Sequence, residues 1–174
     1  MTDLLKTSGE EEYRKGLEQL NSNEQYNLRN ALCYFCEAAE KQHAEAMLQA
    51  GLLYLFAEPQ IIRNVSKATE YFKKSADSGI ATAKDYMAVC YLLGIEVEKN
   101  EELAVRILED NFKIGDYLAA YLLSDIFQKG CGKIVKDEEK AKMYNQFARQ
   151  NNIPDAENQF RRILLQSMNS NLEK

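Results

Sequence analysis

The sequence predicts an all-α fold, an α-solenoid built from antiparallel pairs of helices. Fixed periods of a few tens of residues are the signature of repeat architectures. One alanine recurs about every 37 residues, at Ala31, Ala68, Ala104 and Ala141. A second series keeps the same steps, at Ala46, Ala83, Ala119 and Ala156. Helix start and stop signals repeat in register with the first series. Two interleaved series with one period indicate a repeating pair of helices.

The start signals are residues whose side-chain oxygen accepts a free N–H of the first helical turn. They stand four positions before each alanine of the first series, at Asn27, Asn64, Asn100 and Asp137. Eleven positions after each alanine come Gln42, Gly79, Gly115 and Asn152. Glycine and asparagine commonly end helices in the left-handed conformation, so three of these four positions favour a helix end.

These signals predict helices of about 12 to 15 residues, which alternate between an inner and an outer layer. The first helix is expected to be irregular and to cap the end of the stack, because a terminal unit has no neighbour to cover it. Proline at the start of the last helix is tolerated in a first turn. The expected helices are Glu10–Asn21, Asn27–Gln42, Ala44–Ala57, Val65–Ser78, Ala81–Leu93, Asn100–Lys113, Leu118–Lys129, Asp137–Asn151 and Asp155 to about Met168.

The length of 174 residues is typical of one domain. We expect a single solenoid domain over residues 10–168, with about four helix pairs and a terminal helix. Residues 1–9 are expected to form a flexible N-terminus and residues 169–174 a flexible tail. In the outer helices, Tyr34, Phe35, Tyr71 and Phe72 are expected to face inward at helical spacing.

The repeat also resembles a known family. Residues 44–54 read A-x-A-x-x-x-x-G-x-x-Y, and residues 67–79 read K-A-x-x-Y-F-x-x-x-A-x-x-G. The run from Gly130 to Ala141 matches the connection typical of the Sel-one-like repeat (SLR) family, relatives of the tetratricopeptide repeats. The resemblance implies a right-handed superhelix and a scaffold role in complexes. Asn111 and Phe112 replace a small pair that is usual late in the outer helix, so the third unit is expected to pack differently there.

Composition limits the function classes. A net charge of −5, without a run of three basic residues, argues against a nucleic-acid groove. The longest apolar run, residues 87–95, is shorter than the roughly 20 residues that a bilayer requires. The N-terminal residues lack the pattern of a signal peptide. We therefore expect a soluble cytoplasmic protein, unless it is exported by a route with no readable signal.

Little in the sequence points to catalysis, and we expect no enzyme, no cofactor and no metal. His43 is the single histidine, at a turn where it is expected to be a surface residue or a local cap. Cys33 and Cys36 could form half of a metal site, but zinc needs four ligands and no second pair exists. The four cysteines are expected to be buried or half-buried thiols. Cys36 and His43 lie two turns apart, beyond the reach of a nucleophile and its base.

The inner helices carry large apolar residues on the face that points away from the outer helices. We predict that this face lines the concave surface and binds a partner, with Tyr86 and Leu52 exposed in one hollow. Alternatively, neighbouring inner helices bury much of it. The predicted contact residues are Glu45, Leu48, Gln49, Leu52, Phe56, Asp85, Tyr86, Val89, Leu93, Tyr121, Leu122 and Asp125.

Two functions remain open. The chain is either an adaptor that holds a peptide or protein segment in its concave groove, or a bacterial immunity or regulatory protein that neutralises a toxin or enzyme. An enzyme with Cys36 as its nucleophile is the third and least supported hypothesis. Tyr71→Ala is expected to cost about 3–5 kcal/mol if its ring is fully buried.

Overall fold

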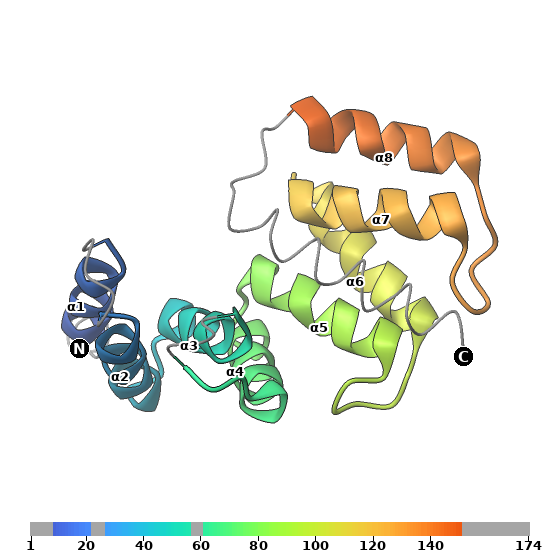
Figure 1. Ribbon diagram of the computed structural model, residues 1–174. Helices are drawn as coiled ribbons and strands as arrows, with labels where there is room; N and C mark the ends of the chain where they lie inside the picture. The colour runs from blue at the N-terminus through green and yellow to red at the C-terminus, as the bar shows by residue number, and fades with distance from the viewer. Residues whose placement is uncertain (1–8, 22–26, 57–60, 151–174) are drawn as a thin grey trace, which may run out of the picture. The chain divides into compact units, whose positions relative to one another are not determined.

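The computed structural model describes residues 9–21, 27–56 and 61–150. Within these ranges the chain forms eight helices and no strand, apart from one isolated bridge between Cys131 and Ile134 (Figure 1). The all-α prediction is therefore confirmed. The helices are α1 (Glu10–Asn21), α2 (Asn27–Glu40), α3 (Ala44–Phe56), α4 (Val65–Asp77), α5 (Ala81–Leu93), α6 (Glu101–Lys113), α7 (Tyr117–Lys129) and α8 (Glu138–Gln150).

The predicted start signals cap three of the outer helices. Asn64 Oδ1 accepts the N–H of Lys67 at 2.9 Å, and Asn100 Oδ1 accepts the N–H of Leu103 at the same distance. Asp137 Oδ1 accepts the N–H of Lys140 at 3.0 Å. Each bond satisfies an N–H that has no partner inside the helix, so these residues define where α4, α6 and α8 begin.

The described helix ends agree with the predicted stop signals, and this includes Gln42, the stop signal that is not a glycine. Gly79 and Gly115 have φ of 99° and 91°. Gln42, at the equivalent place after α2, also adopts a positive φ of 66°. The left-handed conformation thus recurs at this position of the repeat. It follows the end of α2 even though the Gln42 side chain makes that conformation unfavourable.

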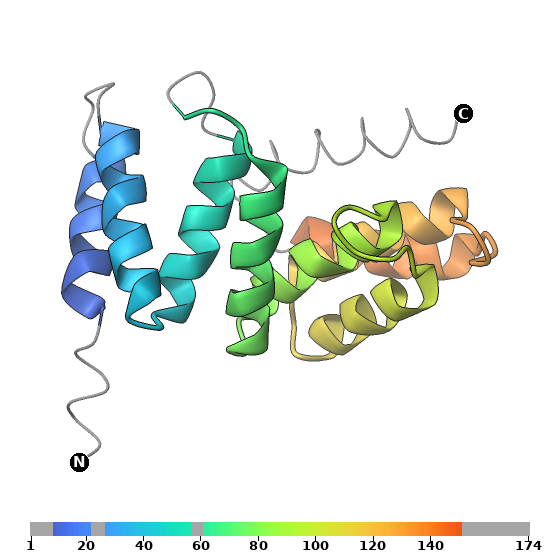
Figure 2. The same cartoon turned by 90° about the horizontal axis from the view of Figure 1, so that it is seen from below.

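Contacts divide the chain into two compact units, residues 1–83 and 84–174. In the first unit α1 packs on α2, α2 on α3 and α3 on α4. Figure 2 shows consecutive helices of this unit running in opposite directions. Its core is built from Ala31, Phe35, Ala38, Ala46, Ala50, Leu53 and Ile61.

Helix α1 packs against α2 in the same way as α3 packs against α4. A Cβ built on Gly16 of α1 would lie 2.5 Å from the ring of Phe35. A Cβ on Gly51 of α3 would lie 2.6 Å from the ring of Phe72 in α4. Glycine is required at both places because the aromatic ring rests on the backbone of the preceding helix. The expected irregular cap therefore occupies the inner-helix position of a first pair.

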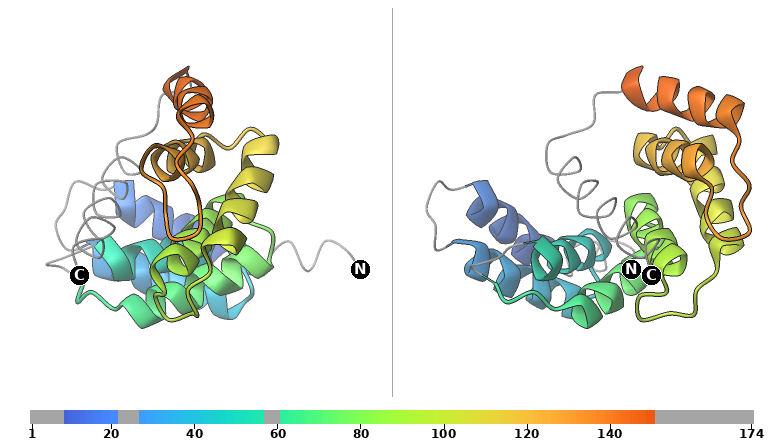
Figure 3. Two further views of the ribbon diagram at one scale, coloured as in Figure 1. Left: turned by 90° about the vertical axis from the view of Figure 1, so that its right-hand side faces the viewer. Right: turned by 45° about the vertical axis from the view of Figure 1, so that its right-hand side comes forward.

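In the second unit α6 packs on α7 and α7 on α8, as the two views of Figure 3 show. Phe112 of α6 meets Tyr144 and Phe147 of α8 edge to face, with ring centroids 4.9 and 5.1 Å apart. Phe112, which replaces one residue of the usual small pair, thus packs between α6 and α8, and Asn111, which replaces the other, is buried.

Several sequence-based expectations lie outside the described residues. These are the terminal helix from Asp155, the stop signal Asn152, the tail 169–174 and residues 1–8. The single domain over residues 10–168 stays a prediction. No helix in the described ranges has the length and apolar character that crossing a membrane requires.

Candidate functional site

The predicted contact face lies on α3, α5 and α7, and most of it is buried. Tyr86 retains 3% exposure, so the expectation that it lies open in a hollow is wrong. Leu52 is half-buried. The buried members of the predicted set are Leu48, Asp85, Tyr86, Val89, Tyr121, Leu122 and Asp125.

The cause is clearest in α7. Every residue from Leu118 to Phe127 is buried. A helix that is apolar on all sides belongs inside a structure, where neighbours cover each face. Helix α7 is packed between α6 and α8. Its face opposite the repeat alanines is therefore core and not an open surface.

The accessible part of the predicted set forms one stripe on α3. Glu45 is exposed, and Gln49, Leu52 and Phe56 are half-buried. Their spacings of four, three and four place all four within about 60° of one another around the helix. We call these four residues the α3 stripe. Leu93, at the end of α5, is the other half-buried member of the predicted set.

His43 directly precedes α3 and lies beside Glu45, at the polar end of the stripe. Its Nδ1 accepts the N–H of Ala46 at 3.2 Å, and its Nε2 lies 3.0 Å from Glu10 Oε2. The imidazole stacks on Tyr13, with ring centroids 4.4 Å apart. Glu45 Oε2 lies 3.6 Å from Nδ1. The histidine thus caps the helix locally, as expected, and joins α1 to α3.

Asp85 was predicted to edge a groove but is instead a core residue with 0% exposure. Its Oδ1 accepts a hydrogen bond from Asn111 Nδ2 at 2.6 Å, which ties α5 to α6. The equivalent residues in α3 and α7 are Leu48 and Tyr121, so this pair is particular to the third unit. A buried polar side chain is tolerated only when it is hydrogen-bonded.

All four cysteines are free thiols. Cys33 is exposed, which corrects the expectation that all would be at least half-buried. Desolvation, with the nearby Glu37 carboxylate, raises the pKa of the Cys33 thiol above its ordinary value. Cys36 Sγ accepts a hydrogen bond from the Tyr71 hydroxyl at 3.3 Å. In the described ranges no three His, Cys, Asp or Glu residues are grouped as metal ligands would be.

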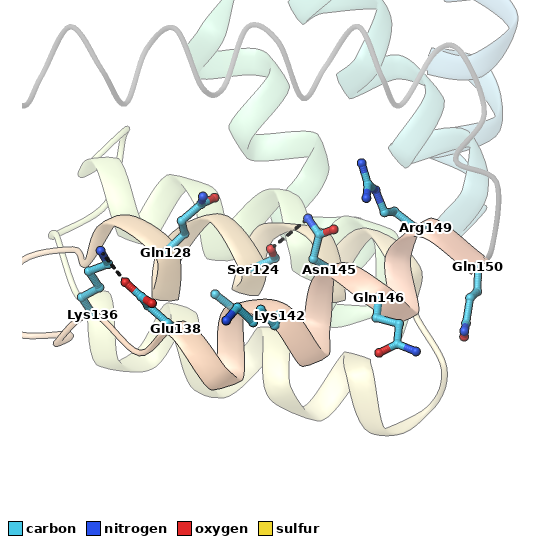
Figure 4. A pocket seen from close by; sticks show the side chains of 10 residues that line it. Ser124, Gln128, Lys136, Glu138, Lys142, Asn145, Gln146, Arg149 and Gln150 are labelled. Atoms are coloured by element: carbon cyan, nitrogen blue, oxygen red, sulfur yellow. Dashed lines mark hydrogen bonds and ion pairs between the residues drawn. The ribbon is translucent and has the colours of Figure 1, made fainter.

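An open groove of about 680 Å³ lies along α7 and α8, and sequence reasoning missed it. Figure 4 shows its polar side chains, with Asn145 Nδ2 donating to Ser124 Oγ at 3.4 Å. Lys136 and Glu138 form an ion pair of 3.1 Å at one end. A polar residue at position 145, where α2 and α4 carry phenylalanine, was the available signal. The lining residues are Ser124, Gln128, Lys136, Glu138, Ala141, Lys142, Asn145, Gln146, Arg149 and Gln150.

Three copies of the Sel1 repeat match this sequence, over residues 44–80, 81–109 and 118–152. They cover more than half of the chain. The chain belongs to the Sel1 repeat family. Proteins built from Sel1 repeats are generally protein-interaction scaffolds. No curated protein matches the sequence significantly.

Solved Sel1 structures share the fold. One from Oxalobacter formigenes has a TM-score of 0.65 at 23% identity, over 85% of this chain and 59% of that one. The protective antigen c5321 of uropathogenic Escherichia coli has a TM-score of 0.65 at 19% identity, over 88% of this chain and 32% of that one. A protein from Klebsiella pneumoniae gives 0.51 at 14% identity, over 92% and 79%. The chain thus spans less than two thirds of the first two relatives.

Proposed function

We propose that this Sel1 repeat protein is a non-catalytic adaptor that holds a segment of another protein on the α3 stripe. The family supports the class of function, because Sel1 repeats typically mediate protein binding. The α3 stripe is chosen as the binding site because α3 is the inner helix on which several residues of the predicted contact face are accessible to solvent. A cytoplasmic location, expected from the sequence, belongs to the same proposal.

The stripe has the composition of a small docking site. Leu52 and Phe56 are one helical turn apart and half-buried, so a partner can complete the burial of two large apolar side chains. Glu45 and Gln49 add polar groups at the other end. Apolar anchors beside polar groups that fix orientation are typical of protein interfaces, where a few residues carry most of the energy.

Covalent capture of the partner tests this proposal. A photo-reactive phenylalanine analogue in place of Phe56 is expected to crosslink one partner in the native cell, identified by mass spectrometry. The same analogue in place of Ile62, which is 87% exposed in the same unit, serves as the matched control. The proposal fails if both positions crosslink the same proteins or if neither crosslinks any.

The affinity for the captured partner then gives the energetic test. Leu52→Glu is expected to weaken binding at least about tenfold, which corresponds to about 1.4 kcal/mol. Ile62→Glu introduces the same charge and should leave the affinity within about twofold. Circular dichroism melting of each variant separates lost binding from lost folding. Equal affinity of the Leu52→Glu variant and the unmodified chain would exclude the stripe.

An immunity or regulatory protein is the second candidate. The net charge of −5 favours it, since an acidic surface accelerates association with a basic enzyme. The two candidates differ in what the captured partner is. A toxin or other enzyme whose activity falls on binding would establish the regulatory role, and a partner without activity would leave the adaptor.

A further inference from the structure

The same two positions recur in each pair of helices, and the residue types at these positions change from one pair to the next. Gly16 faces Phe35, and Gly51 faces Phe72, with each ring resting on a glycine of the preceding helix. The equivalent residues of the third pair are Ala88 and Leu108, both fully buried. In the last pair they are Ser124 and Asn145. The apolar side chain thus becomes smaller along the chain and is finally replaced by an amide.

The polar exchange coincides with a cavity. Ser124 is 3% exposed, and its hydroxyl accepts a hydrogen bond from the Asn145 amide at 3.4 Å. Both residues line the groove on α7 and α8 (Figure 4). Because Asn145 is smaller than the phenylalanine of α2 and α4 and is polar, the last pair keeps an open, polar depression where the earlier pairs have a filled contact. Gln128 and Gln146 add further amide groups to its lining.

The groove is basic although the chain is acidic overall. Among the described residues that line it, the one carboxylate is Glu138, which is paired with Lys136. The hydrogen bond from Lys136 and its positive charge lower the pKa of Glu138, and the charge of Lys142 acts in the same direction. Arg149 is a further cation of the lining, so its cations outnumber its carboxylate. Lys142 and Arg149 are seven residues apart on α8, which places them on one face about 10 Å apart along the axis.

We propose that this groove binds an extended, acidic segment of a partner protein. Two carboxylates would pair with Lys142 and Arg149, and an extended chain covers about 10 Å in three residues. Arginine and lysine bind carboxylates by charge-assisted hydrogen bonds, and arginine can form two at once. The amides of Gln128, Asn145 and Gln146 can donate to and accept from the peptide backbone between them.

Residues 151–174 of the chain itself are the competing occupant. The sequence predicts a helix from Asp155 whose apolar residues include Phe160, Ile163 and Leu164. A polar groove does not suit such a face, because amide and hydroxyl groups would lose water without gaining partners. Arg161 and Arg162 would meet like charge at Lys142 and Arg149, whereas Asp155 and Glu157 of the same segment would not. The polarity of the groove, rather than charge, therefore favours a segment from outside over this apolar face.

Peptide selection with the full chain tests the proposal. Random twelve-residue peptides displayed on phage are selected for binding to the unmodified chain and depleted on the double variant Ser124→Gly/Asn145→Phe. That variant reproduces the Gly51–Phe72 pair and is expected to fill the groove. The retained peptides should be enriched in two acidic residues spaced two to four apart. No retained peptides, or peptides without acidic pairs, would overturn the proposal.

Charge reversal then tests the two cations with one labelled peptide from this selection. Lys142→Glu and Arg149→Glu should each weaken its binding at least tenfold in fluorescence anisotropy. Both side chains are exposed, so these variants should fold even if the double variant does not. Lys73→Glu, an exposed residue of α4 with the same charge change, should stay within twofold. Equal effects of all three substitutions would show only a loss of overall charge and would overturn the assignment.

Two further measurements distinguish the groove from the α3 stripe and an acidic peptide from a nucleic acid. Leu52→Glu should leave the affinity for the acidic peptide unchanged, because Leu52 is not among the described residues that line the groove. A labelled twelve-nucleotide single-stranded DNA should bind at least tenfold more weakly than the peptide. Tighter binding of the DNA would overturn the choice of an acidic peptide.

Discussion

Gln42 occupies a backbone conformation that its repeat equivalents Gly79 and Gly115 adopt more easily. Its φ of 66° lies in the left-handed region, where a side chain costs about 1–2 kcal/mol. Its N–H still donates to the carbonyl of Ala39 at 2.9 Å, so the turn is fully formed. The strain is local and should be relieved by removing the side chain.

Gln42→Gly is therefore expected to stabilise the protein by about 0.5–1 kcal/mol, since the relieved strain exceeds the added chain entropy of glycine. Chemical denaturation measures the change. Gln42→Ala is the matched control, because it shortens the side chain but keeps the strain, and it should change the free energy of unfolding little. An equal gain from both substitutions would show that the backbone at this position is not strained.

Other single residues show which features can be predicted from a few neighbouring residues and which cannot. Asn64, Asn100 and Asp137 cap helices as predicted, because capping depends on four consecutive residues. Tyr71 was expected to face inward, and it is half-buried, stacked on Tyr54 with ring centroids 5.9 Å apart. Its loss should consequently cost less than the cost expected for a fully buried ring. The prediction that Cys33 is at least half-buried was wrong, because periodicity alone does not say how wide the buried face of α2 is.

At the scale of elements, α5 and α6 are joined by a buried polar pair where other units use apolar contacts. Asn111 occupies the place of Ser75, whose hydroxyl donates to the carbonyl of Ala44 at 2.8 Å. Asp85 occupies the place of Leu48. The pair thus keeps a polar link from outer to inner helix but moves it from the backbone to a side chain.

Asp85→Ala and Asn111→Ala are each expected to cost about 1–3 kcal/mol, because each leaves a buried polar group without one of its bonds. Their double-mutant cycle should show coupling of about 1 kcal/mol or more. Asp85→Leu/Asn111→Ala restores the residue types of other units and should regain most of the lost stability. Strict additivity in urea denaturation would mean that the hydrogen bond contributes nothing.

Across the chain, neighbouring groups lower the pKa of carboxylates in both compact units. A hydrogen bond from Lys74 lowers the pKa of Glu70 in the first unit. In the second unit the Glu101 backbone N–H and then Lys99 lower the pKa of Glu101 below its ordinary value of 4.5. The same direction holds for Glu12, beside Lys41.

Because these pKa values are lower in the folded chain, the ionised form stabilises folding above pH 4.5, the ordinary value. That contribution is lost as the pH falls through the folded pKa values. The denaturation midpoint in urea should therefore be constant near neutral pH and fall below pH 4.5. Glu70 is exposed and Glu12 and Glu101 are half-buried, so 1 M salt should shrink part of the difference between pH 7 and pH 3.5. A midpoint that rises on acidification would contradict the stabilising role of these carboxylates.

Local patterns were enough to predict the repeat, the helices and their ends, because caps, alanine spacing and helix stops act within one or two turns. They also identified the Sel1 family, whose motif occupies the same short segments. Which inner-helix residues remain accessible depends on how the helices pack, and no local pattern encodes that packing. Leu52 and Val89 occupy equivalent places in the repeat, yet Leu52 is half-buried and Val89 is core, because burial depends on the helices that pack against each side. The polar groove beside Asn145 also depends on helix packing, since it lies where α7 and α8 meet.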